Sequence, residues 1–310
     1  MTKEDTMTHE PESDATKRSV NVQIVNGFIR DGAGGNPAAV VLDADGLDET
    51  EMQAIATNAG LSETAFVSQS ETEAFKLDFF TPNRRIAHCG HATIGTFSVL
   101  AAQGRVQEGW SSKETVDGPR AIRITEGAAF MEQTAPRYSD EPDWTDTGVT
   151  RAQVLEALGL AEDDHTEGTA PTVVDTGNRF MLVGLKAVEA LRALAPDMAA
   201  IDDISERLDL IGFYVFVPLD GDVAATTRMF APRYGIDEEA ATGMAAGPLG
   251  CLLHDRLGVV QDKLLVEQGA LMTPPSPSLL DVRLTRQGGQ ITSLMVGGYG
   301  RVMTETAIEY

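Results

Sequence analysis

Two segments of this chain are apolar on nearly every face and rich in small residues, namely Ala92–Ala102 and Met244–Leu253. A helix that is apolar all round belongs in the interior of a protein. Both segments follow the same spacing, Phe-x-Pro-x-x-x-Ile, at 80–86 and again at 230–236. Because a strand pattern precedes each spacing, we expect two related halves, each a sheet wrapped round one core helix.

The remaining pattern predicts a mixed α+β fold. From Val20 onward, short strand patterns with turn signals are interrupted by a few helices, without a regular βαβ alternation. A chain of 310 residues with 42% apolar content can bury a large core, and its length favours two domains. Amphipathic helices are expected at 50–57, 151–158 and 198–208. Strands are expected at 22–29, 38–42, 65–68, 75–80, 172–175, 179–183, 213–217 and 226–230.

Residues 1–18 are predicted to be a disordered acidic tail, because they are polar, charged and without an apolar period. This tail lacks the apolar region of a signal peptide, and no later stretch is long and apolar enough to span a membrane. Two cysteines give no disulfide framework and fit a reducing compartment. We therefore expect a soluble, cytoplasmic protein that does not interact with membranes.

The chain is strongly acidic, with 47 acidic residues against 24 basic ones and a net charge of −23. Nucleic acid and anionic membranes would be repelled, so neither is expected as a partner. A halophilic, high-salt cytoplasm would explain such a surface, because molar salt screens the self-repulsion. An ordinary acidic protein is the other interpretation.

Residues 88–91, His-Cys-Gly-His, contain residue types that are typical of a metal site. Zinc needs three or four ligands, however, and the chain has no second Cys/His cluster. Cys89 is open to two interpretations, a nucleophile activated by a helix N-terminus or a small buried residue. Gly298-Tyr299-Gly300 lacks the third glycine and the following helix of a dinucleotide fingerprint. We expect no metal and no cofactor.

Four positions stand out for binding or chemistry. Gly90 and Gly243 open the two apolar helices and present free backbone N–H groups, which would hold an anion if they faced each other across a cleft. Asn36 lies in a turn between two strands and offers a side-chain donor to a substrate. Glu63 stands at a strand entrance without an obvious structural purpose, so it is either a functional carboxylate or a surface acid.

Several motifs together identify a family. They are Gly-Asn-Pro-Ala-Ala-Val-Val at 35–41, Leu-Ser-Glu-Thr-Ala-Phe-Val at 61–67, Phe-Thr-Pro at 80–82, His-Cys-Gly-His-Ala-Thr at 88–93, Asp-Thr-Gly at 175–177, Arg-Met-Phe-Ala-Pro at 228–232, Ala-Thr-Gly at 241–243 and Glu-Gln-Gly at 267–269. From about Val20 to Val302 the chain resembles the phenazine-biosynthesis (PhzF-like) isomerases, which share a duplicated fold with diaminopimelate epimerase.

The resemblance implies a diaminopimelate epimerase-like homodimer that transfers protons without a cofactor, with the active site between two domains. The family's catalytic glutamate falls on Glu63 and its site histidine on His91. The last strand is implied to return to the first domain, which gives a first domain at 19–130 plus 291–305 and a second domain at 131–290.

The sequence departs from the family pattern at two site positions. Glu239 stands where the family has an Asp, so the carboxylate is kept on a longer side chain. Met244 stands where the family has a Ser, which removes a hydroxyl donor and adds bulk beside Thr242 and Gly243. Met244 therefore argues against the dihydro-hydroxyanthranilate substrate of phenazine synthesis.

The sequence thus predicts an isomerase in which Glu63 moves a proton on a small carboxylate-bearing substrate, with His91 and Glu239 beside it. Such a base works best with its pKa raised toward neutrality by partial burial. One alternative is a racemase that uses two cysteines, for which Cys89 lacks a partner because Ala240 stands near the second position. Another is a small-molecule-binding protein of the same fold that has lost its activity.

Overall fold

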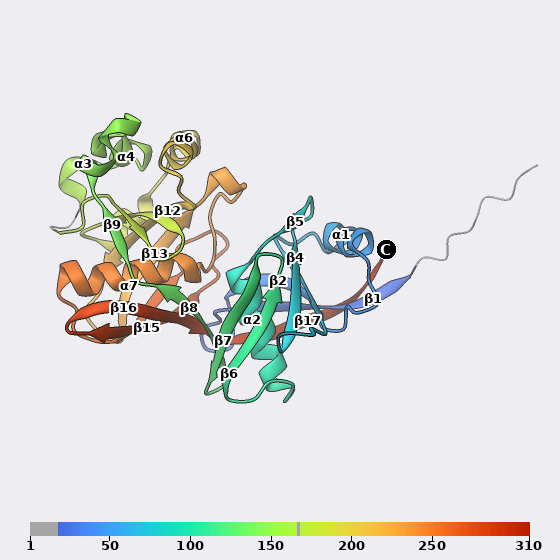
Figure 1. Ribbon diagram of the computed structural model, residues 1–310. Coiled ribbons are helices and arrows are strands. Elements are labelled where there is room, and N and C mark those ends of the chain that lie inside the picture. The colour runs from blue at the N-terminus through green and yellow to red at the C-terminus, as the bar shows by residue number, and fades with distance from the viewer. Residues whose placement is uncertain (1–17, 166–167) are drawn as a thin grey trace, which may run out of the picture.

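Two buried helices, α2 (Gly90–Ala102) and α7 (Gly243–Leu257), organise the fold. The computed structural model describes residues 18–165 and 168–310, so all but the last residue of the predicted tail lies outside the described residues. Figure 1 shows two groups of elements side by side, one round each helix. We call them the α2 half and the α7 half. Both helices lie where the sequence predicts apolar helices.

In the α2 half, every residue of α2 from Gly90 to Leu100 is buried. Strands surround this helix, and α1 (Glu49–Ala59) packs on the outer side of the sheet through Met52 and Ile55. The strands of this half are β1 (Ser19–Gly27), β2 (Asn36–Val41), β3 (Thr64–Ser68), β4 (Phe75–Phe80), β5 (Arg85–Ile86), β6 (Gly109–Thr115), β7 (Gly118–Thr125), β8 (Ala128–Thr134) and β17 (Gly300–Glu309).

In the α7 half, a sheet covers α7 and small helices cover the outer face of that sheet (Figure 1). The helices are α3 (Glu141–Trp144), α4 (Arg151–Ala157), α5 (Val188–Ala193) and α6 (Met198–Leu208), with 3-10 turns η1 (Thr145–Thr147), η2 (Glu162–Asp164) and η3 (Pro232–Tyr234). The strands are β9 (Arg137–Ser139), β10 (Thr172–Asp175), β11 (Arg179–Gly184), β12 (Gly212–Pro218), β13 (Val223–Phe230), β14 (Lys263–Gln268), β15 (Ser278–Gln287) and β16 (Gln290–Gly298).

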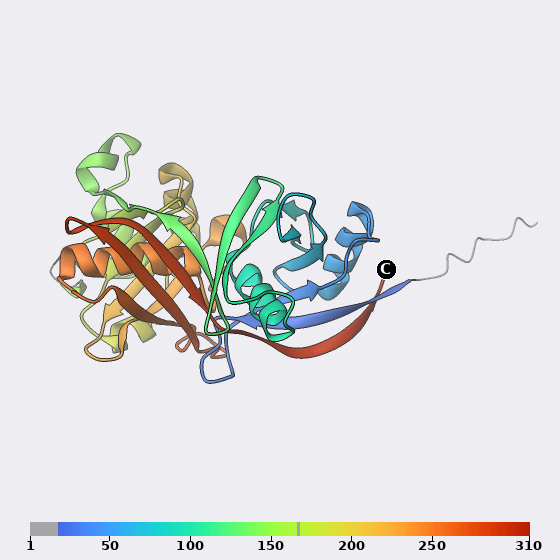
Figure 2. The same ribbon diagram turned by 60° about the horizontal axis from the view of Figure 1, so that its bottom comes forward.

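Parallel and antiparallel pairs both occur in the sheet, which agrees with the predicted mixed α+β class. Strand β2 pairs with β3 and β13 with β14 in parallel, whereas β1 and β17 are antiparallel along their length. Figure 2 shows β1 and β17 side by side as one long ribbon. Strand β16 pairs with both β15 and β8, so it connects the halves. The domain boundaries given above stay predictions.

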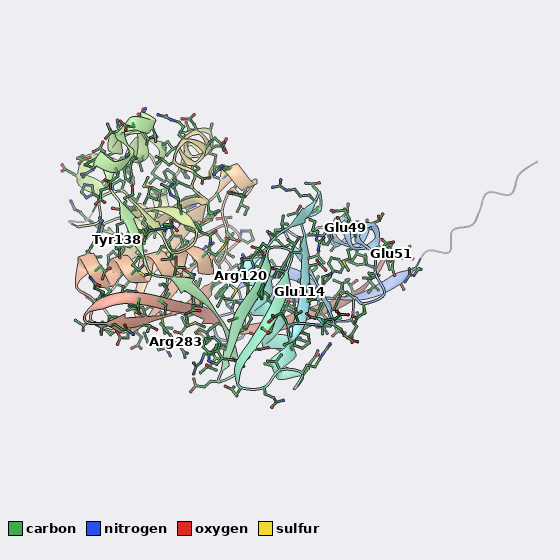
Figure 3. All side chains as sticks on the ribbon, in the orientation of Figure 1. Glu49, Glu51, Glu114, Arg120, Tyr138 and Arg283 are labelled. Carbon is green, nitrogen blue, oxygen red and sulfur yellow. The ribbon has the colours of Figure 1, made fainter. Side chains whose placement is uncertain are left out.

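Helix α1 has a capping residue at each end, and it ends shortly before Glu63. Its capping box joins Asp48 and Glu51, each side chain accepting from the other's backbone N–H at 2.9 and 3.0 Å. Glu49 and Glu51 put negative charge in the first turn, where it is favourable (Figure 3). At the other end Gly60 adopts a left-handed φ of 66°, which turns the chain toward β3.

Strand β1 passes unusually close to the start of α2. A Cβ built on Gly27 would lie only 2.5 Å from the backbone oxygen of His91, and one on Gly95 would lie 2.9 Å from a methyl of Val25. Real Cβ atoms do not approach so closely, so only glycine fits at either position. These two glycines allow β1 to pack directly against the first turns of α2.

One core cluster contains side chains from both α2 and α7, and two smaller clusters lie under α1 and under α4 to α6. The predicted helices at 50–57, 151–158 and 198–208 are confirmed as α1, α4 and α6. Within the described residues, no helix is both long and apolar enough to cross a lipid bilayer.

Candidate active site

Glu63 is held at the entrance of β3, beside β2. Its backbone oxygen accepts a hydrogen bond from Ala39 N at 3.0 Å, and the next residue, Thr64, pairs with Ala39 in the parallel register. The Glu63 side chain is 13% exposed. Its Oε2 atom is buried and has no hydrogen-bond partner among the described residues. A buried carboxylate is costly unless an opposite charge compensates it, and the ion pair with His91 described next does so.

His91 lies between two carboxylates. It belongs to the first turn of α2, and its side chain is 4% exposed. Nε2 lies 3.2 Å from Glu63 Oε2, and Nδ1 lies 3.4 Å from Glu239 Oε1. Glu63 comes from the α2 half and Glu239 from the loop before α7, so the histidine joins the two halves.

Glu239 is fixed by side chains from both halves. Asn36, the first residue of β2, donates from Nδ2 to Glu239 Oε1 at 2.9 Å and to the Ala241 carbonyl at 3.0 Å. Thr242 donates from its hydroxyl to Glu239 Oε2. The structure therefore brings Glu63, His91, Glu239, Asn36 and Thr242 into one contiguous polar cluster, as the sequence predicts for a single site.

The three remaining predicted residues lie at the helix N-termini beside this cluster. A Cβ built on Gly90 would lie 3.9 Å from Met244 Cγ and 3.6 Å from Met131 Cε, so the starts of α2 and α7 adjoin each other. A Cβ on Gly243 would lie 2.8 Å from the ring of Phe28, so a glycine is required there. Within the described part of the chain no side chain caps either helix, which leaves backbone N–H groups for an anion.

The two partners in the centre of the cluster shift each other's pKa. Burial raises the pKa of Glu63, but the contact with His91, its charge and Ser62 outweigh burial and hold it below the usual value. Burial lowers the pKa of His91, but Cys89 and the carboxylates Glu239 and Glu63 raise it well above the usual range. The expectation of a raised Glu63 pKa is therefore wrong, because it considered burial without the histidine.

Cys89 borders the same cluster. Its Sγ lies 3.7 and 3.8 Å from the two ring nitrogens of His91, and burial raises its pKa. Glu63, Cys89 and His91 offer three ligand atoms within 4.8 Å of one another. A metal would need the thiol to lose its proton, and the raised pKa of Cys89 opposes that. That the protein uses no metal stays a prediction.

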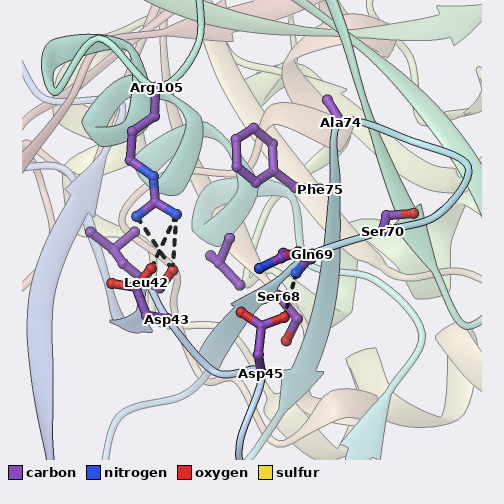
Figure 4. A pocket seen from close by; sticks show the side chains of 10 residues that line it. Leu42, Asp43, Asp45, Ser68, Gln69, Ser70, Ala74, Phe75 and Arg105 are labelled. Atoms are coloured by element: carbon purple, nitrogen blue, oxygen red, sulfur yellow. Dashed lines mark hydrogen bonds and ion pairs between the residues drawn. The ribbon is translucent and has the colours of Figure 1, made fainter.

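Two surface pockets lie away from these residues. The one in Figure 4 is lined by Leu42, Asp43, Asp45, Phe75 and Arg105 among others, and Arg105 donates to Asp43 Oδ1 at 3.2 Å. The second lies between the start of α3 and the end of α7. Neither lining contains a predicted site residue, a cysteine or a histidine. The polar cluster round His91 therefore remains the candidate active site.

Sequence reasoning missed Gln268 as a site residue. This buried side chain at the end of β14 donates to the Glu239 carbonyl at 2.7 Å and to Thr242 Oγ1 at 3.1 Å. Its only sequence signal is its place in the Glu-Gln-Gly motif at 267–269. Cys251, the other cysteine of the chain, is buried in the interior of α7, where burial raises its pKa to about 12.

Known proteins of one family match this chain over nearly its whole length. A family model described as phenazine biosynthesis-like protein matches residues 25–306. An uncharacterised isomerase from Clostridium acetobutylicum is 30% identical over 282 residues, covering 87% of this chain and 92% of that protein. The trans-2,3-dihydro-3-hydroxyanthranilate isomerase of Pseudomonas fluorescens is 32% identical over 287 residues, covering 90% and 96%. The crystal structure of a PhzF family protein from Bacillus anthracis is similar at 26% identity, with a TM-score of 0.83 over 94% of this chain and 99% of that chain.

These matches confirm the family that the motifs indicate and the two-domain, diaminopimelate epimerase-like fold. The family-model match extends through both halves, from the end of β1 to most of β17, and several of the relatives carry the name isomerase. The chain is therefore an isomerase of the phenazine biosynthesis-like family.

Proposed function

We propose that this protein catalyses cofactor-independent proton transfer on a small carboxylate-bearing substrate, with Glu63 as the acid/base. The observation that carries the proposal is Glu63 Oε2, a buried oxygen that forms an ion pair with His91 Nε2 at 3.2 Å but accepts no well-aligned hydrogen bond among the described residues. A general base must keep an acceptor free for the proton that it removes. Gly90 and Gly243 support a carboxylate beside it, because they start two uncapped helices.

The reaction proceeds in two proton transfers with no net change in composition. Glu63, ionised at neutral pH because its pKa is lowered, takes a proton from a carbon conjugated to the substrate carboxylate. The electron pair of the broken C–H bond spreads into the conjugated system, and the N–H groups at the starts of α2 and α7 stabilise the added charge. Glu63 then returns the proton to a different carbon, which gives the isomer.

His91 and Glu239 support this carboxylate without replacing it. The raised pKa of His91 favours its charged form, which stabilises the ionised form of Glu63 and, after proton transfer, the substrate anion. Glu239 holds the ring from the Nδ1 side at 3.4 Å. Met244 lies beside Gly90 and puts an apolar side chain where the family has a hydroxyl. This favours a substrate other than dihydro-hydroxyanthranilate.

Two other functions can be distinguished from the proposed proton transfer. A racemase that uses two thiols would need a second cysteine near Cys89, but Cys251 is buried in α7 and Ala240 lies next to Glu239. A binding protein that has lost its activity would hold a ligand without exchanging its hydrogen. The buried Glu63 carboxylate, paired with His91, favours proton transfer over both.

The function is tested by solvent exchange. We expect the protein in deuterium oxide to introduce deuterium into at least one member of a panel of cyclic and amino carboxylates, followed by proton NMR and mass spectrometry. Denatured protein serves as the control. Saturable binding without exchange would replace the proposed reaction with the binding function. Exchange that disappears on alkylation of Cys89 but persists in Glu63→Gln would favour the thiol chemistry.

We further propose that the protein works as a cytoplasmic homodimer, as the family resemblance implies, with domains at 19–130 plus 291–305 and at 131–290. The charge of −23 supports a high-salt cytoplasm. If so, the melting temperature rises steeply between about 0.1 M and about 3 M KCl, because salt at the higher concentration screens charges beyond about 3 Å. An equal rise in sucrose of matched osmolality, or no rise, would contradict salt adaptation.

A further inference from the structure

Gln268 makes four hydrogen bonds in the interior, next to the site. Its Oε1 accepts from Thr242 N and from Tyr214 OH, both at 3.0 Å. Its Nε2 donates to the Glu239 carbonyl at 2.7 Å and to Thr242 Oγ1 at 3.1 Å. The side chain is fully buried. The amide of a glutamine has two donors and one acceptor oxygen with two lone pairs, so its bonding capacity is fully used.

The backbone fixes which way this amide points. Thr242 N can only donate and the Glu239 carbonyl can only accept, so Oε1 and Nε2 of Gln268 cannot exchange places. Nε2 then donates to Thr242 Oγ1, which leaves the hydroxyl proton of Thr242 for Glu239 Oε2. One side chain thus holds Glu239 by its backbone directly and by its carboxylate through Thr242.

The neighbouring backbone reinforces this arrangement. Gly269 has φ of 76°, and a Cβ there would lie 2.2 Å from Ser276 O and 2.7 Å from Ala240 O. The end of β14 is therefore packed directly against the loop that carries Glu239. Asn36 holds the same carboxylate from the α2 half through Oε1. The loop has no other side-chain anchor to β14 among the described residues.

We propose that Gln268 is a positioning residue that holds the Glu239 carboxylate against Nδ1 of His91. The inference rests on the proposed function only in that the His91 and Glu63 pair is the reacting pair. Without Gln268, the loop loses its anchor to β14 and Glu239 moves away from the ring. His91 then loses one of the two carboxylates that favour its charged form, and its proton affinity falls.

The groups that face His91 come from three elements. Glu63 approaches from the entrance of β3, Cys89 from the residue before α2, and Glu239 from the loop before α7. Behind the first turn of α2, Lys113 of β6 donates to Thr93 Oγ1 at 2.6 Å and does not reach the ring. Of these groups, only Glu239 is held by Gln268.

The test is the titration of His91 in the folded protein, followed by 15N NMR of histidine-labelled samples. The chain has five histidines, and His91→Gln identifies the resonance. We expect Gln268→Met to reduce the proton affinity of His91 by about tenfold, the size of one hydrogen bond to a charged group. Glu239→Gln should give a similar fall, and the double variant should fall no further than Glu239→Gln alone.

Tyr214→Phe is the matched control, because it removes one bond to Gln268 Oε1 and leaves both bonds from Nε2. It should leave the His91 titration at the wild-type value. If Gln268→Met does not fold, Gln268→Asn serves, since it stays polar but is one methylene too short to reach Glu239. An unchanged titration in a folded Gln268 variant, additive effects in the double variant, or the same fall in Tyr214→Phe would each overturn the assignment.

This experiment uses no substrate. A protein that exchanges hydrogen with none of the compounds tested would contradict the proposed function but would leave the His91 titration, and with it the role of Gln268, to be decided separately. Conversely, an unchanged titration in Gln268→Met would remove this role while exchange that depends on Glu63 stayed intact.

Discussion

Replacing Glu63 with glutamine is expected to reduce hydrogen exchange into the substrate by about 10³-fold, within the range that a positioned acid/base contributes. The introduced amide has nearly the same shape as the carboxylate but cannot accept a proton at neutral pH. It would still fill the space beside His91, so the fold should persist. Exchange rates in deuterium oxide, measured at saturating substrate by proton NMR, give the effect directly.

Two further variants sharpen this result. Glu63→Asp keeps the carboxylate but retracts it by one methylene from its position 3.2 Å from His91 Nε2, so it should retain part of the activity. Glu71→Gln changes an exposed glutamate in the turn before β4 and should behave as wild type. Exchange in Glu63→Gln at the wild-type rate would remove Glu63 from the chemistry.

The pair also predicts how Glu63→Gln changes the histidine. His91 owes its raised pKa partly to Glu63, so the variant should titrate at lower pH than wild type. In the wild type, the raised histidine pKa contributes stability that is present below the unfolded-state value near 6.5 and is lost as pH rises through the folded-state value. Glu63, with its lowered pKa, contributes above about pH 4.5 and loses its contribution as pH falls.

The sequence predicted the two core helices because their composition leaves no polar face. In Ala92–Ala102 and Met244–Leu253 apolarity on all sides has one structural meaning, burial, and the structure buries both segments. The hairpin of β6, β7 and β8 was not predicted. Its middle strand, Gly118–Thr125, is half exposed with a weak alternation. The turn that follows has positive φ at Glu126 and Gly127 but lacks the Asn-Gly or Asp-Gly pair that marks such a turn in a sequence.

Strand β17 shows a different limit of sequence reasoning. Its residues are mostly exposed and polar, so no hydrophobic pattern marks Gly300–Glu309 as a strand. What holds it is backbone pairing with β1, from Ser19 opposite Glu309 to Gly27 opposite Gly300. Pairing between the two ends of a chain leaves no local signal, and here only the family resemblance indicated that the chain returns to its first domain.

The sequence predicted which residues form the candidate site, but it did not predict how their side chains interact. Glu63 and His91 came from motif positions, and the structure places them 3.2 Å apart. The sign of the Glu63 pKa shift depends on that contact, which no local pattern contains. Gln268 depends in the same way on Tyr214 and Thr242, which come from other elements. Networks between distant segments are the part of a site that sequence alone does not predict.

Replacing Lys113 is expected to change the stability of the protein strongly. Its side chain on β6 is fully buried, and Nζ lies 2.9 Å from His88 Nδ1, 2.6 Å from Thr93 Oγ1 and 4.7 Å from the centre of the Phe79 ring. Among the described residues, no carboxylate forms an ion pair with it at 4.0 Å or less. A buried ammonium without a counter-ion is costly, and burial lowers the pKa of Lys113 from 10.5 to about 7.

The sign of the pH effect follows from proton binding. Between about pH 7 and about pH 10.5 the unfolded chain holds a proton on Lys113 that the folded protein has released, so the stability of the wild type rises with pH across this window. Below it, both states are charged and the full cost of the buried charge is present. The difference is up to about 5 kcal/mol, at about 1.4 kcal/mol for each pH unit of the window.

Lys113→Met removes this dependence. We expect the variant to gain stability relative to wild type at about pH 6.5, and this advantage to shrink by several kcal/mol at about pH 9.5, measured by urea unfolding at each pH. Lys263→Met, at a lysine whose side chain is 60% exposed, is the matched control and should show a constant difference. Parallel stability curves for Lys113→Met and wild type would mean that the buried amine keeps the same proton in both states. Lys113 donates to Thr93, whose hydroxyl in turn donates to the Cys89 carbonyl at 2.6 Å, so two hydrogen bonds link the buried amine to the residue before α2.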